Sequence, residues 1–153
     1  MSRRIDPTKV AQGALQAMYG LEKYLAECAI ELPLRNLIKV RASQINGCAY
    51  CIDMHWKDAH AKGESEQRLY GLSAWREAPY YSERERAALA WTEELTLIAN
   101  NHVSDDLYEQ TRRKFSEQEL VDLTLAVVTI NAWNRITISF RQEPGTYQPA
   151  LRK

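Results

Sequence analysis

Apolar residues recur at steps of three and four along most of this 153-residue chain, which is the spacing of one face of a helix. Over residues 10–31 the positions on this face are Val10, Ala14, Ala17, Met18, Leu21, Leu25, Cys28 and Ala29. Pro33 allows a new helix to begin, and the same period continues over residues 34–45. Asn46-Gly47 then supplies a helix stop. The pattern therefore predicts two successive helices that end at this break.

Two capping boxes mark helix beginnings in the second half of the chain. They occupy residues 82–85 and 116–119, and each has a serine followed three residues later by a glutamate. The two side chains of such a box bind backbone N–H groups that the first turn of a helix leaves unpaired. We expect the first of these helices to end at residues 100–101. The second should be apolar on nearly every side and extend to about residue 140.

Shorter elements complete the predicted fold. Helical patterns also cover residues 48–61, 64–72 and 104–114, whereas residues 143–153 contain two prolines and a glycine and should be irregular. No alternating strand pattern occurs, so the sequence predicts an all-α fold in a single domain over residues 1–153. A last helix that is apolar on nearly every side is either the central helix of a bundle or part of a subunit interface.

The composition is that of an ordinary globular protein, with 45% hydrophobic and 26% charged residues. Twenty basic residues balance twenty acidic ones, so charge gives no reason to expect nucleic acid or an anionic membrane as a partner. No apolar run approaches the roughly 18 residues of a membrane span, and the N-terminus lacks the apolar core of a secretory signal. Three cysteines are too few for a disulfide scaffold. We expect a cytoplasmic protein that is free to self-associate.

The candidate chemistry lies directly after the predicted helix stop, in residues 48–55, CAYCIDMH. If a helix begins at Cys48, then Cys48, Cys51 and His55 fall on one face, at positions i, i+3 and i+7. The beginning of a helix has unpaired N–H groups and the positive end of the helix dipole, both of which favour a thiolate. We interpret this arrangement as a site of thiol redox chemistry.

The spacing of the two cysteines permits an intramolecular redox cycle. A thiolate is the reactive form of cysteine, and His55 is within side-chain reach of Cys51 as a base or proton relay. A sulfenic acid or mixed disulfide formed on one cysteine can be attacked by the other, which closes a disulfide.

Two other interpretations compete with this one. The cysteines of the motif can be unconnected residues on a helix that also carries a surface histidine. They can also bind zinc together with His55, although a closed structural zinc site takes four ligands. His60 is about 140° further round the helix and points away, which leaves the distant His102 as the fourth candidate.

Several other side chains are expected to have structural roles. Asp53 and Lys57 are four residues apart on one helix and should form a solvated ion pair. Trp91 and Trp133 lie on apolar helix faces, which is typical of core residues. Asn134 lies on the apolar stripe of the last helix, so it should be a satisfied buried polar group or a specificity device at an interface.

Residues 41–55, RASQINGCAYCIDMH, resemble the signature of the alkylhydroperoxidase D-like (AhpD-like) branch of the carboxymuconolactone decarboxylase family. Residues 69–76, 88–93 and 130–135 also resemble that family, so the similarity extends over about residues 30–142. The resemblance implies an AhpD-like helical bundle, assembly into trimers or hexamers, and thiol-dependent peroxidase activity. We expect no cofactor and no metal.

The resemblance also assigns roles to the motif. Cys51 would attack a hydroperoxide substrate and become a sulfenic acid, and Cys48 would be the proton donor and resolving thiol. His55 matches the relay histidine of the family. A thiol or dithiol, either a protein or a small molecule, would return the electrons.

Two positions depart from the family pattern. The relay glutamate of the family lies twelve residues before the first cysteine, and this chain has Asn36 there, which cannot act as a base. The best-studied members carry a histidine before the second cysteine, and this chain has Tyr50. His55, the helix end and the Tyr50 hydroxyl would then activate the thiol, and Ser43 could hold the preceding turn. We expect weak peroxidase turnover, with a general disulfide reductase or a redox-sensing oligomer as the alternative.

Overall fold

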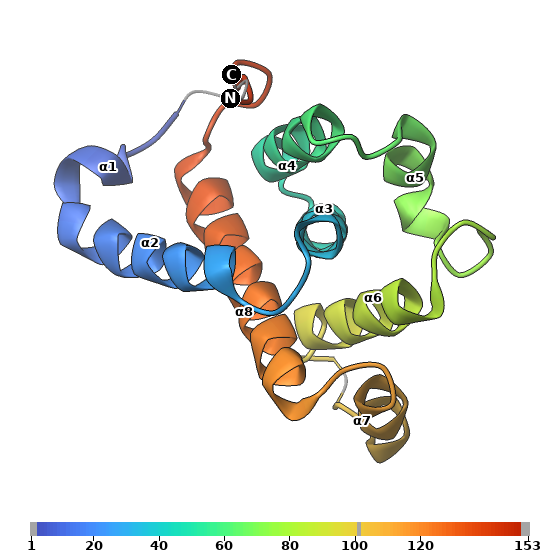
Figure 1. Cartoon of the computed structure of the whole chain (residues 1–153). Helices are drawn as coiled ribbons and strands as arrows, with labels where there is room; N and C mark the ends of the chain where they lie inside the picture. Colours follow the sequence, from blue (N-terminus) through green and yellow to red (C-terminus); the bar gives the residue numbers. More distant parts are fainter. Residues whose placement is uncertain (1–2, 101, 151–153) are drawn as a thin grey trace.

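The computed structural model describes residues 3–100 and 102–150, and over these residues every regular element is a helix (Figure 1). The elements are α1 (Pro7–Val10), α2 (Gln12–Glu27), α3 (Leu32–Asn46), α4 (Ala49–Ala61), α5 (Glu66–Tyr70), the 3-10 turn η1 (Gly71–Ala74), α6 (Glu83–Thr96), α7 (Asp105–Arg112) and α8 (Glu117–Phe140). The prediction of an all-α fold is confirmed.

The predicted boundaries are correct around the cysteine motif and in the last helix. α3 ends at Asn46, α4 begins one residue after Cys48, and α8 begins one residue after Ser116. Both capping boxes form, with the serine hydroxyl and the glutamate carboxylate each accepting a backbone N–H of the other residue. Residues 143–150 are irregular as predicted, and residues 151–153 lie outside the described part of the chain.

The prediction of one helix over residues 10–31 is wrong at both ends. A separate turn, α1, precedes α2 because Asp6 accepts a hydrogen bond from the N–H of Thr8 at 3.0 Å and caps that turn. α2 ends at Glu27, where the guanidinium of Arg35 binds carbonyl oxygens of the last turn. Arg35, a residue of α3, thus donates to carbonyl oxygens that backbone N–H groups would bind if α2 were longer.

Two other boundaries also differ. α6 ends at Thr96, earlier than predicted, because the N–H of Asn100 bonds to the carbonyl of Leu97 at 2.8 Å and closes a turn instead of a helical repeat. Asn101, the second residue of the predicted stop, lies outside the described residues. The short helix predicted over residues 64–72 is divided into α5 and η1, which together end two residues later.

α3 lies at the centre of the fold, with the other long helices around it (Figure 1). One hydrophobic cluster joins α3 to α6 and α8 and includes Ile38, Trp91 and Leu123. A second cluster joins α3 to α4 and to the α5–η1 segment and includes Leu37 and Ala59. Burial of a large apolar side chain contributes roughly 1.5–3 kcal/mol to folding, so two clusters of this kind fix α3 relative to both groups of neighbours.

α8 is not the central helix, which was one of the two positions expected for so apolar a segment. It packs against α3 on one side and leaves apolar side chains in solvent on the other: Val121 is 55% exposed, Val128 50% and Ile138 46%. The other expected position, in a subunit interface, stays a prediction. Trp91 is buried in the core, as predicted.

The turn between α3 and α4 depends on Gly47, whose φ is +68°. Its N–H bonds to the carbonyl of Gln44 at 3.2 Å, and the N–H of Cys48 bonds to the carbonyl of Ser43 at 3.0 Å. Glycine adopts this left-handed conformation without the steric cost that a Cβ would add. The predicted stop is confirmed, and it makes Cys48 the N-cap residue of α4.

A partly buried network of amide and hydroxyl groups joins this turn to α8. Asn46 Nδ2 donates to Oδ1 of Asn131 at 2.9 Å and to Oδ1 of Asn134 at 2.8 Å. Asn134 Nδ2 donates to Ser43 Oγ at 3.1 Å. Asn134 is fully buried, so its predicted role as a satisfied buried polar group is confirmed.

Asn134→Ala should destabilise the protein by about 1–3 kcal/mol, because Asn46 and Ser43 each lose a buried hydrogen-bond partner. Urea unfolding followed by circular dichroism measures the change. Ser139→Ala, at an exposed position on the same helix, is the matched control and should leave the free energy of unfolding within about 0.5 kcal/mol of the wild-type value. Equal stabilities of the two variants would show that the network adds nothing.

Candidate active site

The two cysteines of the motif are joined by a disulfide at the beginning of α4, with their Cα atoms 5.3 Å apart. Cys48 is the N-cap residue, and its Sγ accepts a hydrogen bond from the N–H of Cys51 at 3.3 Å. Cys51 lies in the first turn of the helix. The sequence therefore located a pair of sulfurs at a helix N-terminus correctly, and the helix directs an N–H group at Cys48.

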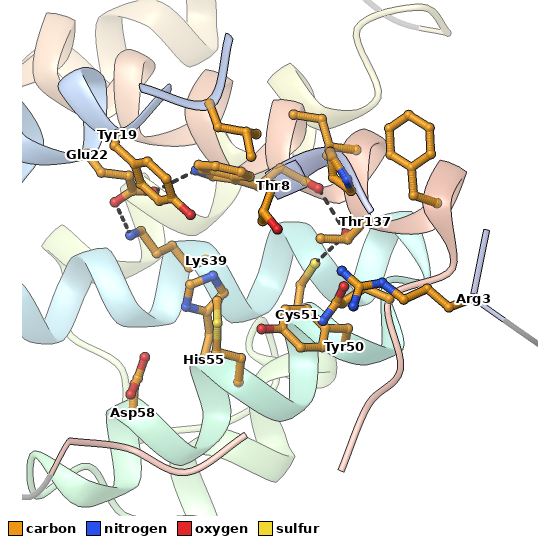
Figure 2. A pocket seen from close by; sticks show the side chains of 17 residues that line it. Arg3, Thr8, Tyr19, Glu22, Lys39, Tyr50, Cys51, His55, Asp58 and Thr137 are labelled. Carbon is orange, nitrogen blue, oxygen red and sulfur yellow. Dashed lines mark hydrogen bonds and ion pairs between the residues drawn. The ribbon is translucent and has the colours of Figure 1, made fainter. Parts of the chain in front are cut away.

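Cys51 forms part of the wall of a cavity of about 390 Å³ (Figure 2). Its wall comes from α1, α2, α3, α4, α8 and the segment before α1, and is largely aromatic and apolar, with Tyr19, Met54 and Phe140 among its residues. Cys48 and Cys51 are each 1% exposed. Of the two cysteines, Cys51 is the one that lines the cavity. A molecule that enters this space therefore approaches Cys51.

Thr137, on α8, contacts both sulfurs. Its Oγ1 is 3.0 Å from Cys48 Sγ and 3.0 Å from Cys51 Sγ. The same hydroxyl lies 2.9 Å from the carbonyl oxygen of Trp133 and 3.1 Å from that of Asn134. Thr137 also lines the cavity, so α8 supplies a polar group directly at the disulfide (Figure 2).

His55 follows Cys51 by about one helical turn, lines the cavity and is 8% exposed. Burial lowers the pKa of its imidazole to about 3, and the positive charges of Lys39 and Lys62 act in the same direction. The ring is therefore neutral at physiological pH, and its unprotonated nitrogen can accept a hydrogen bond. Within the described part of the chain no hydrogen bond fixes its orientation.

An ion pair that also accepts a tryptophan N–H forms part of the cavity wall, as His55 does. Lys39 Nζ is 2.7 Å from Glu22 Oε2, and Trp133 Nε1 donates to Glu22 Oε1 at 3.1 Å. Tyr19 packs on Trp133 with ring centroids 5.4 Å apart. Figure 2 shows Lys39 between Glu22 and His55. These contacts join α2, α3 and α8 around the cavity.

The three residues proposed to support the site lie in different places. Tyr50 lines the cavity, and burial raises the pKa of its hydroxyl. Ser43 is buried; its hydroxyl donates to the carbonyl of Lys39 on the preceding turn of α3 at 2.7 Å, and its backbone carbonyl, which accepts the N–H of Cys48, holds the turn. Asn36 is buried on α3, 7% exposed, and is not among the residues that line the cavity.

Sequence reasoning missed the contributions of α2, α3 and α8 to the site. Glu22, Lys39 and Thr137 carried no local signal, because each reaches the cavity only through the packing of distant helices. Trp133 was expected in the core, and this is wrong: it is half-buried and lines the cavity, because its indole faces α2.

The outer side of α4 is covered by the C-terminal segment. The predicted pair of Asp53 and Lys57 forms, at 2.8 Å. Asp53 also accepts a hydrogen bond from the N–H of Gly145 at 3.0 Å, and Tyr147 donates its hydroxyl to Asp58 at 2.7 Å. Asp58 lines the cavity, so this segment holds one carboxylate of the site in place.

The described residues contain no group of three or more histidine, cysteine, aspartate or glutamate side chains placed to hold a metal ion. His60 is exposed and stacks on Trp56, and His102 is exposed in the segment between α6 and α7. None of the helices in residues 3–100 and 102–150 has the length and apolarity needed to cross a bilayer.

Comparison with known sequences gives a family match and a near full-length relative. The sequence profile described as Carboxymuconolactone decarboxylase family matches residues 11–94. An uncharacterised protein of Bacillus subtilis, YdfG, is 46% identical over 139 residues, which amount to 91% of this chain and 95% of that protein.

Solved structures of AhpD-like proteins have the same fold as this chain. A protein of unknown function from Agrobacterium tumefaciens, described provisionally as the antioxidant defence protein AhpD, matches with a TM-score of 0.91 at 42% identity, over 95% of this chain and 100% of that chain. An uncharacterised peroxidase-related protein from Ralstonia eutropha with an alkylhydroperoxidase AhpD core matches with a TM-score of 0.78 at 17% identity, over 89% of this chain and 73% of that chain. At that identity the second match shows a shared fold alone.

The buried neutral His55 should make stability depend on pH. The folded protein binds fewer protons than the unfolded chain between pH 3 and 6.5, so the free energy of unfolding falls as the pH drops through this window. Between pH 6.5 and 5 the oxidised wild type should lose about 1.6 kcal/mol more than His55→Gln, which cannot titrate. Urea unfolding at a series of pH values measures both slopes, and identical slopes would contradict a buried neutral imidazole.

Proposed function

The chain belongs to the carboxymuconolactone decarboxylase family, and we propose that it is a thiol-dependent peroxidase that cycles Cys48 and Cys51 between dithiol and disulfide. One observation carries the proposal: Cys51 is bonded to Cys48 and lines a cavity large enough for a small organic molecule. A peroxide in that cavity meets Cys51. We therefore assign the attack on peroxide to Cys51 and the resolving step to Cys48, as the family resemblance implies.

The reaction has three steps. The Cys51 thiolate attacks the terminal oxygen of a hydroperoxide; the O–O bond breaks, the sulfur is oxidised to a sulfenic acid, and the alkoxide takes up a proton and leaves as an alcohol. Cys48 then attacks the sulfenic sulfur, the S–S bond forms, and water leaves with the thiol proton. A thiol or dithiol reductant finally reduces the disulfide by exchange and is itself oxidised.

His55 is the proposed proton relay. Its neutral ring can take the proton of the Cys51 thiol and pass it to the leaving alkoxide. Burial and the positive charge of Lys39 disfavour the charged imidazolium, so protonation of His55 costs free energy and should slow the relay. Cys48 is the second proposed source of a proton for the leaving group.

Weak turnover is part of the proposal. Asn36 deprives the family relay of its carboxylate, and the carboxylates that line the cavity have other partners. Glu22 is bonded to Lys39 and Trp133, and Asp58 accepts the hydroxyl of Tyr147. The donors to each carboxylate would lose a charged acceptor if that carboxylate took up a proton, so neither is a free base beside Cys51.

The cavity supports a small organic hydroperoxide as the substrate. Its wall is mostly aromatic and apolar, which suits a hydrocarbon group beside the reacting oxygen. The cysteines are each 1% exposed, so we propose that a small thiol or dithiol, entering by the same route, is the reductant. A cysteine pair that must return to the dithiol form suits a reducing compartment, and we propose the cytoplasm.

Assembly into a trimer or hexamer also belongs to the proposal. It rests on the family resemblance and on the exposed apolar side of α8, where Val121 and Val128 are 55% and 50% exposed. A second candidate function follows from the same face and from Asn36: a redox-sensing oligomer that is oxidised once and changes its association. A general disulfide reductase is less favoured, because a folded disulfide substrate would have to reach nearly buried sulfurs.

Mild peroxide treatment of the reduced protein should produce a Cys48–Cys51 disulfide, detected by mass spectrometry of the peptides. The rate of peroxide consumption should fall roughly tenfold or more in Cys51→Ser, because this substitution removes the attacking thiolate. Cys28→Ser is the matched control and should keep the wild-type rate, since Cys28 packs against the core cluster away from the cavity. Full peroxide consumption by Cys51→Ser would rule out the proposed enzyme.

Excess dithiol and organic hydroperoxide distinguish the enzyme from the sensor. A peroxidase should convert many equivalents of hydroperoxide per subunit, with unchanged subunit number in light scattering. A sensor should consume one equivalent per subunit and change its molar mass on oxidation. The second outcome would replace the peroxidase with the sensor.

A further inference from the structure

The two sulfurs differ in the hydrogen-bond donors available to them. The N-terminus of α4 provides a donor to Cys48, whose Sγ accepts a hydrogen bond from the N–H of Cys51 at 3.3 Å. Among the residues that the structure describes, Thr137 is the one that brings a side-chain polar atom within hydrogen-bond distance of Cys51 Sγ, its Oγ1 at 3.0 Å. His55 lines the same cavity but forms no such bond there. The thiol that faces the cavity therefore depends on α8, and not on its own helix, for a polar contact.

We propose that Thr137 is a catalytic residue, whose hydroxyl donates a hydrogen bond to whichever cysteine carries the negative charge during the cycle. This rests on the proposed peroxidase function and adds a residue to it. Thr137 Oγ1 is 3.0 Å from each sulfur. One hydroxyl thus lies within hydrogen-bond distance of both sulfurs in the oxidised protein.

The hydroxyl has another acceptor for the oxidised state. Its oxygen is 2.9 Å from the carbonyl of Trp133 and 3.1 Å from the carbonyl of Asn134 on the preceding turn of α8. A disulfide sulfur is a weak acceptor, so in the oxidised protein the hydrogen points to a carbonyl. A thiolate is charged and attracts the donor more strongly, so after reduction the hydrogen turns toward the sulfur.

The contact acts at two points in the reaction. It stabilises the Cys51 thiolate before the attack on peroxide, and it stabilises a Cys48 thiolate while Cys48 attacks the sulfenic sulfur. Thr137 transfers no proton, so the balance of the steps above is unchanged. The charged and titratable groups that share the cavity with Cys51 are Arg3, Tyr19, Glu22, Lys39, Tyr50, His55 and Asp58. All of them are retained in the variants compared below.

The test is the pH dependence of iodoacetamide alkylation of Cys51 in a Cys48→Ala background, followed by mass spectrometry of the Cys51 peptide. Thr137→Val replaces the hydroxyl with a methyl group of similar size. Loss of the donor should move the midpoint of the profile upward by roughly one pH unit, which is about a tenfold slower alkylation below the midpoint. Thr137→Ser keeps a hydroxyl and should restore the midpoint of the parent.

A parallel series in a Cys51→Ala background reports on Cys48, whose midpoint should rise by less, because the N–H at position 51 still donates to it. An unchanged Cys51 midpoint in Thr137→Val would overturn the proposal, as would failure of Thr137→Ser to restore it. If Thr137→Val does not fold by circular dichroism, Thr137→Ala reports the same loss of the hydroxyl. Because alkylation needs no peroxide, a shifted midpoint in a protein without turnover would reject the peroxidase and keep the hydrogen bond.

Discussion

The left-handed turn at Gly47 is the constraint on which the site depends. It ends α3, begins α4 two residues later and makes Cys48 an N-cap residue, so that Cys51 follows in the first turn. The amide network of Asn46 and Asn134 then joins this turn to α8. With these contacts in place, the sulfurs meet the hydroxyl of Thr137 without any further adjustment of the backbone.

Burial also determines the chemistry of the site, because it affects both the His55 imidazole and the two sulfurs. It keeps the His55 imidazole neutral, and it surrounds the sulfurs with side chains in place of water. Electrostatic interactions are stronger in such a site, so a single hydroxyl donor or the charge of Lys39 matters more than it would at the surface. The ion pair of Lys39 with Glu22 limits that charge and leaves the cavity largely apolar beside Cys51.

Features that depend on nearby residues were predictable from the sequence, and features that depend on packing were not. The stop at Gly47, the capping boxes and the shared face of Cys51 and His55 follow from spacings of a few residues, and the structure has all of them. The opposite wall of the cavity follows from how α2 and α8 pack on α3. No periodicity in the chain indicates that Thr137, 86 positions after Cys51, touches the same sulfur. The same limit explains the error at Trp133.

The central claim is that Cys51, at the cavity wall, is the thiol that attacks peroxide. Trapping of the sulfenic acid with dimedone tests it most directly, in Cys48→Ser and Cys51→Ser proteins treated with one equivalent of an organic hydroperoxide and analysed by mass spectrometry. The account predicts a dimedone adduct on Cys51 in the first protein and little adduct on Cys48 in the second. An adduct mainly on Cys48, or on neither cysteine, would contradict it.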